Sequence, residues 1–386
     1  MPRAVKTAVA VYGTIFAIME KTIMTDYKKL AGASINSLTA YKPGKPVAEL
    51  KRELGLDKII KMASNENPYG PSPHVKDAVK SGLDDIFRYP LGDAFDIRMK
   101  VAAKYDVSPD ELTFGTGSNE LIELMMRTFI HGGETVMSPA PSFSVYGLTA
   151  TAMGTKCDWV PVNSDFKTDM DELLSKITPQ TRIVFLANPN NPLGNYITAT
   201  ELTYFMDKVP SDVIVAMDEA YIEFADAADI PDTLAMRRKY GNMILLRTFS
   251  KAYGLAGLRI GYAIAPRDAT DMMNRVRQPF NTNSLAQIGA YAAIDDVEWL
   301  KRVVALNAEC RRQLYAGFER LGLPYVKSQA NFILVNVKDG KGVFERLLRQ
   351  GVIVRYMGDA LKPYVRVSVG TKEENEIFLA ALAKVL

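Results

Sequence analysis

Short, unbroken runs of apolar residues alternate with longer helical stretches through the middle of this 386-residue chain, and this alternation restricts its fold more than any other feature. The runs are bounded by turn residues and lack the polar–apolar alternation of strands with one face in water. Strands of this kind are buried on both faces, as in a parallel sheet between two layers of helices. We therefore predict an α/β fold with strands near residues 112–114, 135–137, 183–186, 213–217 and 244–246.

Polar or turn-forming residues follow each of these five predicted strands. Ligands of open α/β sheets bind outside the carboxyl ends of the strands. Five such ends in succession predict one large site rather than five unrelated surface loops. The segments concerned are Gly115–Asn119, Pro139–Phe143, Asn188–Pro192, Asp218–Tyr221 and Ser250-Lys251.

The last third of the chain has a different pattern. Amphipathic helices near residues 296–321 and 341–350 alternate with strands near residues 332–335 and 365–369. This pattern predicts a smaller α+β domain, and the chain is long enough to form two domains.

Composition argues against several kinds of chemistry. Lys and Arg number 47 against 44 Asp and Glu, so we expect neither a nucleic-acid nor a membrane partner. Two histidines leave almost no scope for a His-based triad or a His-rich site, and we expect no metal. His74 and His131 lie beside Pro and Gly, and we interpret both as turn residues. Cys157 and Cys310 form no metal or redox motif, which indicates a reducing cytoplasm.

The N-terminal segment stands apart from the rest. The apolar stretch Thr7–Met19 follows Arg3 and Lys6 as the core of a signal peptide would, but no Ala-x-Ala cleavage site comes after it. It is also too short to span a membrane. We interpret residues 1–25 as an extension, either disordered or the product of an incorrectly assigned start, with Met24 as the alternative start.

A lysine lies just beyond the fifth apolar run, within the segment Thr248–Tyr262. Lys251 is flanked by hydroxyl-bearing residues, and Arg259 follows it eight positions later. A lysine amine is nucleophilic only when deprotonated, and burial near a cation lowers its pKa. A single Ser-Lys pair is usually a solvated loop. The spacing to Arg259 and the motifs upstream favour a lysine that forms an imine in a cleft.

The lysine segment resembles that of the fold-type I pyridoxal-phosphate (PLP) aminotransferases, and within them the histidinol-phosphate aminotransferase family. Motifs around residues 65, 117, 191, 218 and 366 occur in the family's order, and the resemblance runs from about residue 30 to residue 386. It implies a large domain with a mostly parallel central sheet flanked by helices, plus a smaller α+β domain. The implied boundaries are 26–70 for an N-terminal arm and part of the small domain, 71–290 for the PLP-binding domain and 291–386 for the rest of the small domain.

The resemblance implies a role for each residue around the cofactor ring. Lys251 would form the imine and then move the proton, and Asp218 would pair with the pyridine nitrogen and keep the ring an electron sink. Tyr221 and Asn191 would hydrogen-bond the ring oxygen. Phe143 would stack on the ring, at a position where the family more often has tyrosine.

The phosphate group of the cofactor needs several donors. Free backbone N–H groups at a helix start make an anion site, and an arginine adds a charge-assisted contact. The resemblance also implies a tyrosine from a neighbouring subunit, so that the active site is shared in an obligate homodimer. The residues assigned to this cradle are Gly117, Ser118, Asn119, Thr248, Ser250, Arg259 and, from the second subunit, Tyr89.

Substrate recognition is assigned to four further positions. Histidinol phosphate carries a phosphate and glutamate carries carboxylates, so one pocket must take either anion in turn. Forked guanidinium groups suit both anions. Arg355 and Arg366 match the family's arginines for this role, and Tyr41 and Asn65 match other substrate-side positions.

The implied reaction is transamination between L-histidinol phosphate and 2-oxoglutarate, which gives imidazole acetol phosphate and glutamate in histidine biosynthesis. An aminotransferase for phenylalanine and a lyase resembling threonine-phosphate decarboxylase remain open alternatives. The sequence does not show which bond at the substrate Cα stands perpendicular to the ring. A PLP-sensing transcriptional regulator is disfavoured because the segment before the catalytic part is too short for a DNA-binding domain. Asp218 and Lys251 argue against a cofactor-free scaffold.

Overall fold

The computed structural model describes residues 25–39, 50–52, 55 and 59–386 of the chain. The chain divides into two compact units, residues 1–40 and residues 41–386. In the first unit, helix α2 (Tyr27–Ser37) begins where the Asp26 side chain accepts a hydrogen bond from the Lys29 backbone N–H at 3.1 Å. Our interpretation of residues 1–25 falls outside the described residues, apart from residue 25 itself.

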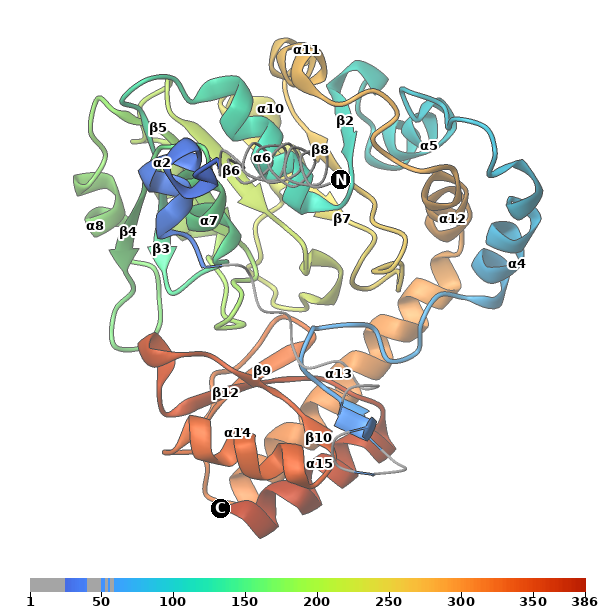
Figure 1. Cartoon of the computed structure of the whole chain (residues 1–386), viewed down its shortest axis with the longest axis vertical. Coiled ribbons are helices and arrows are strands. Elements are labelled where there is room, and N and C mark those ends of the chain that lie inside the picture. The colour runs from blue at the N-terminus through green and yellow to red at the C-terminus, as the bar shows by residue number, and fades with distance from the viewer. Residues whose placement is uncertain (1–24, 40–49, 53–54, 56–58) are drawn as a thin grey trace, which may run out of the picture. The chain divides into compact units, whose positions relative to one another are not determined.

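A seven-stranded sheet forms the centre of the second unit (Figure 1). Strands β3 to β7 are parallel to one another, whereas β8 is antiparallel to both β2 and β7. In sheet order the strands are β2 (Leu112–Gly115), β8 (Gly261–Ile264), β7 (Met243–Thr248), β6 (Ile214–Asp218), β5 (Thr181–Ala187), β3 (Thr135–Ala140) and β4 (Cys157–Pro161).

The five predicted strands are confirmed, and all five run in the same direction. The sequence did not reveal β4 and β8. Strand β4 lies at the edge of the sheet, and of its five residues only Val160 is buried, so it has no continuous apolar run. Strand β8 has four residues and begins at Gly261, inside the lysine segment, so the motif hid it.

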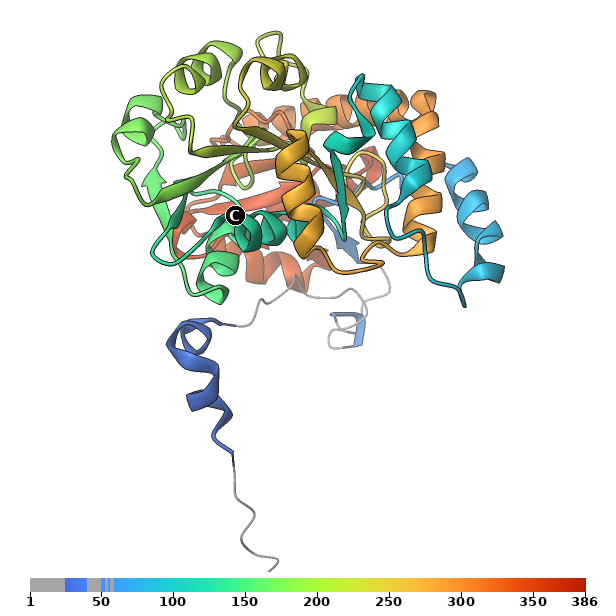
Figure 2. The ribbon, with the colours of Figure 1, turned by 90° about the horizontal axis from the view of Figure 1, so that it is seen from above.

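The two faces of the sheet are both buried, as the unbroken apolar runs predicted. In β5, Ile183 and Phe185 pack in one core cluster and Val184 and Leu186 in another, because successive side chains of a strand point to opposite faces. Figures 1 and 2 show helices in front of and behind the sheet. One face packs against α6 (Ser118–Phe129), α7 (Val145–Ala152) and α11 (Arg267–Val276). The other face packs against α4 (Pro73–Ser81), α5 (Phe95–Tyr105), α8 (Met170–Ser175), α9 (Ala199–Met206), α10 (Thr233–Lys239) and α12 (Ser284–Asp295).

A second, smaller sheet belongs to the C-terminal part. It is antiparallel, in the order β11 (Arg355–Tyr356), β12 (Tyr364–Ser368), β9 (Phe332–Asn336). A separate core cluster lies between this sheet and the helices α13 (Val297–Arg320), α14 (Gly340–Arg349) and α15 (Lys372–Val385). The one-turn 3-10 helices are η1 (Leu83–Asp85), η2 (Pro109–Glu111), η3 (Ile222–Phe224) and η4 (Asp359–Leu361).

The N-terminal residues of the second unit join this C-terminal part. Strand β1 (Ile60–Lys61) pairs in parallel with β10 (Val352–Ile353). The pairing supports a small domain assembled from both ends of the chain, and we propose the domain boundaries at residues 70 and 290 on that basis.

His74 is not a turn residue, contrary to our interpretation. It is the second residue of α4, which begins at Pro73 after Ser72, whose hydroxyl accepts a hydrogen bond from the Val75 N–H at 3.2 Å. A serine cap followed by proline is a helix-start signal, because proline lacks the N–H that would be unpaired at that position. The signal was present in the sequence.

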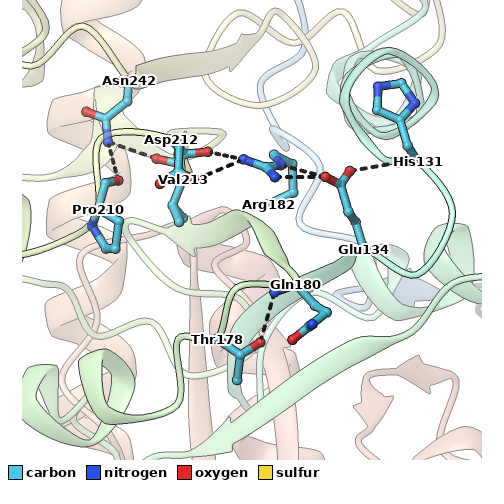
Figure 3. A network of polar contacts seen from close by, with 9 residues as sticks. All are labelled: His131, Glu134, Thr178, Gln180, Arg182, Pro210, Asp212, Val213 and Asn242. Carbon is cyan, nitrogen blue, oxygen red and sulfur yellow. Dashed lines mark hydrogen bonds and ion pairs between the residues drawn. The ribbon is translucent and has the colours of Figure 1, made fainter.

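A polar network joins the amino ends of β3, β5 and β6, away from the predicted site (Figure 3). The Arg182 guanidinium donates to Glu134 Oε1 through Nη2 at 2.8 Å and to the Asp212 carbonyl through Nη1 at 2.7 Å. Glu134 also accepts from the His131 backbone N–H at 2.9 Å. Burial raises the pKa of Glu134. The hydrogen bonds from the His131 N–H and Arg182 lower it by more than burial raises it, so the pKa lies below its ordinary value.

Replacing Arg182 by methionine should therefore lower the free energy of unfolding by about 1–2 kcal/mol at pH 7. The folded pKa of Glu134 lies below its unfolded value. Its contribution is thus present above the unfolded pKa and lost as the pH falls through the folded pKa, which means below about pH 4. The difference in free energy of unfolding between wild type and Arg182→Met should therefore be smaller at that low pH. Denaturant titrations at pH 7 and pH 3.5 measure it. Lys176→Met, which removes an exposed ion pair with Glu172, is the control and should change little.

Candidate active site

A cavity of about 760 Å³ opens at the carboxyl ends of the central strands. Residues from all five predicted strand-end segments line it, together with residues of the small domain between β10 and β12. The sequence predicted one large site from those five segments, and the structure brings them together. The cavity therefore has the position expected for a ligand of an open α/β sheet.

Asp218 lies at the end of β6 and is 4% exposed. Its carboxylate accepts hydrogen bonds from the Tyr146 hydroxyl at 2.8 Å and from the Ala220 N–H at 3.2 Å. Burial raises the pKa of Asp218, and these two donors offset only part of that rise. A buried carboxylate of this kind is stabilised when a cation in the cavity pairs with it.

The next residue, Glu219, points to the opposite face of the sheet, as strand alternation requires. It forms a buried ion pair with Arg247, with Glu219 Oε2 and Arg247 Nε 2.7 Å apart. Glu219 follows Asp218 at the end of β6, and Arg247 precedes Thr248 at the end of β7. The pair therefore ties together, from behind, the two strand ends that face the cavity.

Lys251 lies just beyond β7, and its side chain lines the cavity. Its Nζ donates to the Ser64 carbonyl at 3.4 Å and lies 5.5 Å from the centre of the Tyr221 ring. The amine thus shares the cavity with Asp218 and Tyr221, where a carbonyl compound could reach it.

The predicted phosphate residues meet at one side of the cavity. Arg259 donates to the Ser250 hydroxyl through Nη1 at 3.3 Å, and Thr248 donates to the same oxygen at 3.0 Å. Gly117 precedes α6 with φ of 77°, and a Cβ there would lie 2.6 Å from Arg259 Nη2. The positive φ favours glycine here, and a Cβ would force the guanidinium to move. The helix start at Ser118, which no side chain caps, faces the same space.

Tyr221 lies directly before η3 and is 5% exposed. Its hydroxyl accepts a hydrogen bond from Asn65 Nδ2 at 3.0 Å. Asn65, which the resemblance assigned to the substrate, is bound in turn by Ser368 of β12. Asn65 therefore touches the tyrosine that the resemblance assigns to the cofactor.

The two substrate arginines lie opposite each other, because Arg355 of β11 is in register with Arg366 of β12. Both line the cavity. Arg366 donates to Asn191 Oδ1 at 2.6 Å and to the Ala63 carbonyl at 2.7 Å. The bond to Asn191 Oδ1 leaves the amide nitrogen of that asparagine to donate into the cavity. Two guanidinium groups at one end make that end selective for anions.

Four further predicted residues remain, and two of them line the cavity. Phe143 lines the cavity and meets Tyr146 edge to face, with ring centres 5.7 Å apart. Tyr89 is 83% exposed and stacks on Phe280, away from the cavity of its own subunit. Tyr41 lies outside the described residues. Asn119, the remaining cradle residue, lines the cavity beside Ser118.

Tyr146 and Ser368 are site residues that the sequence did not reveal. Tyr146 is fully buried, stacks on Phe185 with ring centres 4.6 Å apart and holds Asp218. A tyrosine inside an apolar stretch of helix gives no sign of which carboxylate it will meet, so only packing could assign this contact.

Two negative observations apply to the part of the chain that the structure describes. Within it, no group of three or more His, Cys, Asp or Glu residues is arranged to hold a metal ion. None of its helices is both long enough and apolar enough to cross a membrane.

Comparison with known proteins agrees with this geometry. Residues 57–382 match the family "Aminotransferase class I and II". A histidinol-phosphate aminotransferase of Caldicellulosiruptor saccharolyticus is 43% identical over 355 residues, which cover 91% of this chain and 99% of that protein. Another, from Anaeromyxobacter sp. (strain Fw109-5), is 45% identical over 355 residues, covering 91% of this chain and 98% of that protein. The crystal structure of the Sinorhizobium meliloti histidinol-phosphate aminotransferase in complex with pyridoxal-5'-phosphate superposes with a TM-score of 0.83 at 27% identity, covering 91% of this chain and 96% of that one.

The fold and the site define an aminotransferase of the PLP-dependent fold-type I class. The chain belongs to the aminotransferase class I and II family.

Proposed function

We propose that this enzyme transfers the amino group between L-histidinol phosphate and 2-oxoglutarate, giving imidazole acetol phosphate and glutamate in histidine biosynthesis. The observation that carries the proposal is the cavity itself, whose lining includes Asp218, Lys251 and the Arg259 cradle together with Arg355 and Arg366. Relatives that share 43–45% of their residues with this chain bear the name of this activity, which supports it.

The residues present fit PLP as the cofactor. Its pyridine nitrogen, once protonated, supplies a cation that can pair directly with the buried Asp218 carboxylate. Its phosphate matches the glycine-lined helix start beside Arg259 and Ser250. When bound, the cofactor draws electrons from the substrate Cα and so makes its proton removable.

The protein's own residues divide the remaining work. Lys251 Nζ would hold the cofactor covalently, and once the substrate amine displaces it, the same nitrogen would carry the proton from the substrate Cα. Asp218 would keep the pyridine nitrogen protonated, and Tyr221 and Asn191 would donate to the ring oxygen. Phe143 would cover one face of the ring and keep water from it.

The two arginines account for a pocket that accepts either substrate. Because Arg355 and Arg366 are in register on adjacent strands, their guanidinium groups can act on one anion together. A phosphate of charge near −2 and a glutamate side-chain carboxylate both suit this arrangement. The pocket end they form would therefore hold the phosphate of histidinol phosphate and the distal carboxylate of glutamate in turn. Asn65 and Tyr41 stay assigned to the substrate side by the resemblance.

We further propose that the enzyme acts as a homodimer with shared active sites. Tyr89 belongs to an exposed apolar patch formed by residues 83–95 together with Phe280, of a kind that marks protein interfaces. The patch consists of Leu83, Ile86, Phe87, Tyr89, Leu91, Phe95 and Phe280, each 45–83% exposed. Burial of this patch against a second subunit would bring Tyr89 to the partner's phosphate cradle.

Tyr89→Phe should keep the dimer, because the ring still stacks on Phe280, but should weaken PLP binding about 10-fold or more. The reason is the loss of a hydroxyl that donates to a charged phosphate. Equilibrium titration of the apoenzyme with PLP measures the affinity, and sedimentation measures the assembly. Tyr204→Phe removes a hydroxyl from α9, outside the patch, and is the control. Unchanged affinity in Tyr89→Phe, or a monomeric wild-type enzyme, would contradict the shared site.

A cytoplasmic location completes the proposal. It is supported by two unpaired cysteines, Cys157 and Cys310, in the described residues.

A half-reaction titration tests the substrate assignment. L-Histidinol phosphate, L-phenylalanine and O-phospho-L-threonine are added separately to the PLP-loaded enzyme while the visible band of the lysine-bound cofactor is followed. Rapid loss of the band with histidinol phosphate and with glutamate is the expected result. Loss mainly with phenylalanine would replace the substrate and keep the chemistry, and release of carbon dioxide from phosphothreonine would replace transfer by decarboxylation.

A further inference from the structure

We propose that Asn65 is a positioning residue that acts through Tyr221, in addition to facing the substrate. Asn65 Nδ2 donates to Tyr221 Oη at 3.0 Å, and both side chains are almost fully buried, at 1% and 5% exposed. The proposal rests on the proposed function in one respect, because it requires PLP in the cavity with its ring oxygen near Tyr221.

The orientation of the Asn65 amide follows from its neighbour Ser368. The Ser368 hydroxyl oxygen accepts the Asn65 backbone N–H at 2.8 Å, so its single proton is available for Asn65 Oδ1, 3.0 Å away. An amide oxygen that faces Ser368 places the amide nitrogen toward Tyr221. Ser368 thus fixes which end of the Asn65 amide meets the phenol.

The backbone around Asn65 is held by the small domain. The Met62 N–H donates to the Ile353 carbonyl at 2.7 Å, and the Ser368 N–H donates to the Met62 carbonyl at 2.8 Å. Asn331 Nδ2 donates to the Asn65 carbonyl at 3.0 Å. Asn65 itself has φ of 56°, a left-handed conformation that asparagine tolerates better than most residues. The backbone that carries the Asn65 amide is therefore held in place relative to the small domain.

The consequence concerns the one proton on the Tyr221 hydroxyl. Since Asn65 occupies a lone pair of that oxygen as a donor, the phenolic proton cannot point at Asn65 and is free to point into the cavity. Accepting one hydrogen bond also makes a hydroxyl a better donor of the next. Asn65 thereby commits Tyr221 to donate to the ring oxygen of the bound cofactor.

This donation should lower the proton affinity of the nitrogen that joins Lys251 to the cofactor. That nitrogen shares its proton with the ring oxygen, and a donor on the oxygen withdraws negative charge from it. Removing Tyr221's donation raises the pH midpoint at which the visible band titrates, and weakening it through Asn65 raises the midpoint by a smaller amount.

The experiment is a pH titration of the visible band in the PLP-loaded holoenzyme without substrate. We expect Asn65→Ala to raise the midpoint by about 0.5–1 pH unit, the size of a weakened hydrogen bond. Asn65→Asp should raise the midpoint by about 1–2 units. A carboxylate would accept the hydrogen bond of the Tyr221 hydroxyl in place of the ring oxygen, and its charge would stabilise the protonated nitrogen that joins Lys251 to the cofactor. Ser368→Ala should shift it in the same direction by less than Asn65→Ala.

Coupling to Tyr221 separates this role from a structural one. In a Tyr221→Phe background, Asn65→Ala should produce no further shift, because the residue through which it acts is already lost. Asn375→Ala is the matched control: this asparagine is fully buried and donates to the Cys310 carbonyl at 3.2 Å, with no contact to Tyr221. It reports the effect of losing a buried amide by itself and should leave the midpoint unchanged.

Two results would overturn the inference. One is a midpoint unchanged in Asn65→Ala while the KM for histidinol phosphate rises, which makes Asn65 a substrate ligand alone. The other is an equal shift in the presence and absence of the Tyr221 hydroxyl. If Asn65→Ala does not fold, Asn65→Asp and Ser368→Ala decide by the same criteria. A wild-type enzyme that shows no visible band after loading with PLP would instead refute the proposed cofactor, so the two failures are distinguishable.

Discussion

Replacing Lys251 by alanine should abolish the absorbance band of the lysine–cofactor imine and reduce transamination by about 10,000-fold or more. The amine is the group that both anchors the cofactor and moves the proton, and the cavity places its Nζ 5.5 Å from the centre of the Tyr221 ring. Non-covalent PLP binding should persist, because the cradle around Arg259 and the carboxylate of Asp218 stay in place. Absorbance spectra and single-turnover kinetics measure the two effects.

Lys251→Arg is the control for charge. It keeps a cation in the cavity, but a guanidinium does not deprotonate in proteins and cannot serve as a nucleophile. The arginine variant should therefore behave like the alanine variant. An imine band that survives in Lys251→Ala would mean that another amine holds the cofactor.

Replacing Asp218 by asparagine should weaken cofactor binding by about 2–5 kcal/mol, because a buried charge pair loses one partner. Turnover should fall about 100- to 1,000-fold, as for other losses of a preorganised charge. The apoenzyme should respond in the opposite way. Its folded-state pKa for Asp218 is raised by burial, so the ionised carboxylate costs stability as the pH rises through that value. Apo Asp218→Asn should consequently unfold at the same or a higher temperature than apo wild type at pH 7.

Thermal unfolding with and without PLP measures both halves of this prediction. Wild type should gain much more stability from PLP than the asparagine variant. Tyr146→Phe, which removes one donor to Asp218 and leaves the carboxylate, should give an intermediate loss of affinity. An apo Asp218→Asn protein clearly less stable than apo wild type would show that the carboxylate serves the fold rather than the cofactor.

Much of the central sheet could be predicted from the composition of its strands and from local motifs. The runs at β3, β5, β6 and β7 were recognisable because strands buried on both faces are apolar at every position. Their direction could be inferred because helical stretches separate them, as in parallel crossover units. Strand β4 has no such run, and β8 lies within the lysine motif, so neither gave a signal. The missed β8 is also the strand that breaks the parallel pattern.

The sequence by itself determined the class of fold and the chemical content of the cavity, because the residues concerned follow the strand ends directly. Only the tertiary structure decided the contacts among them. Tyr146 meets Asp218 across 72 residues, and Asn65 meets Ser368 across 303. Such pairs depend on the order of strands and on how the small domain packs, which no local pattern encodes. Local periodicity follows from backbone geometry and burial, whereas partners distant in the chain are chosen by the packing of the whole fold.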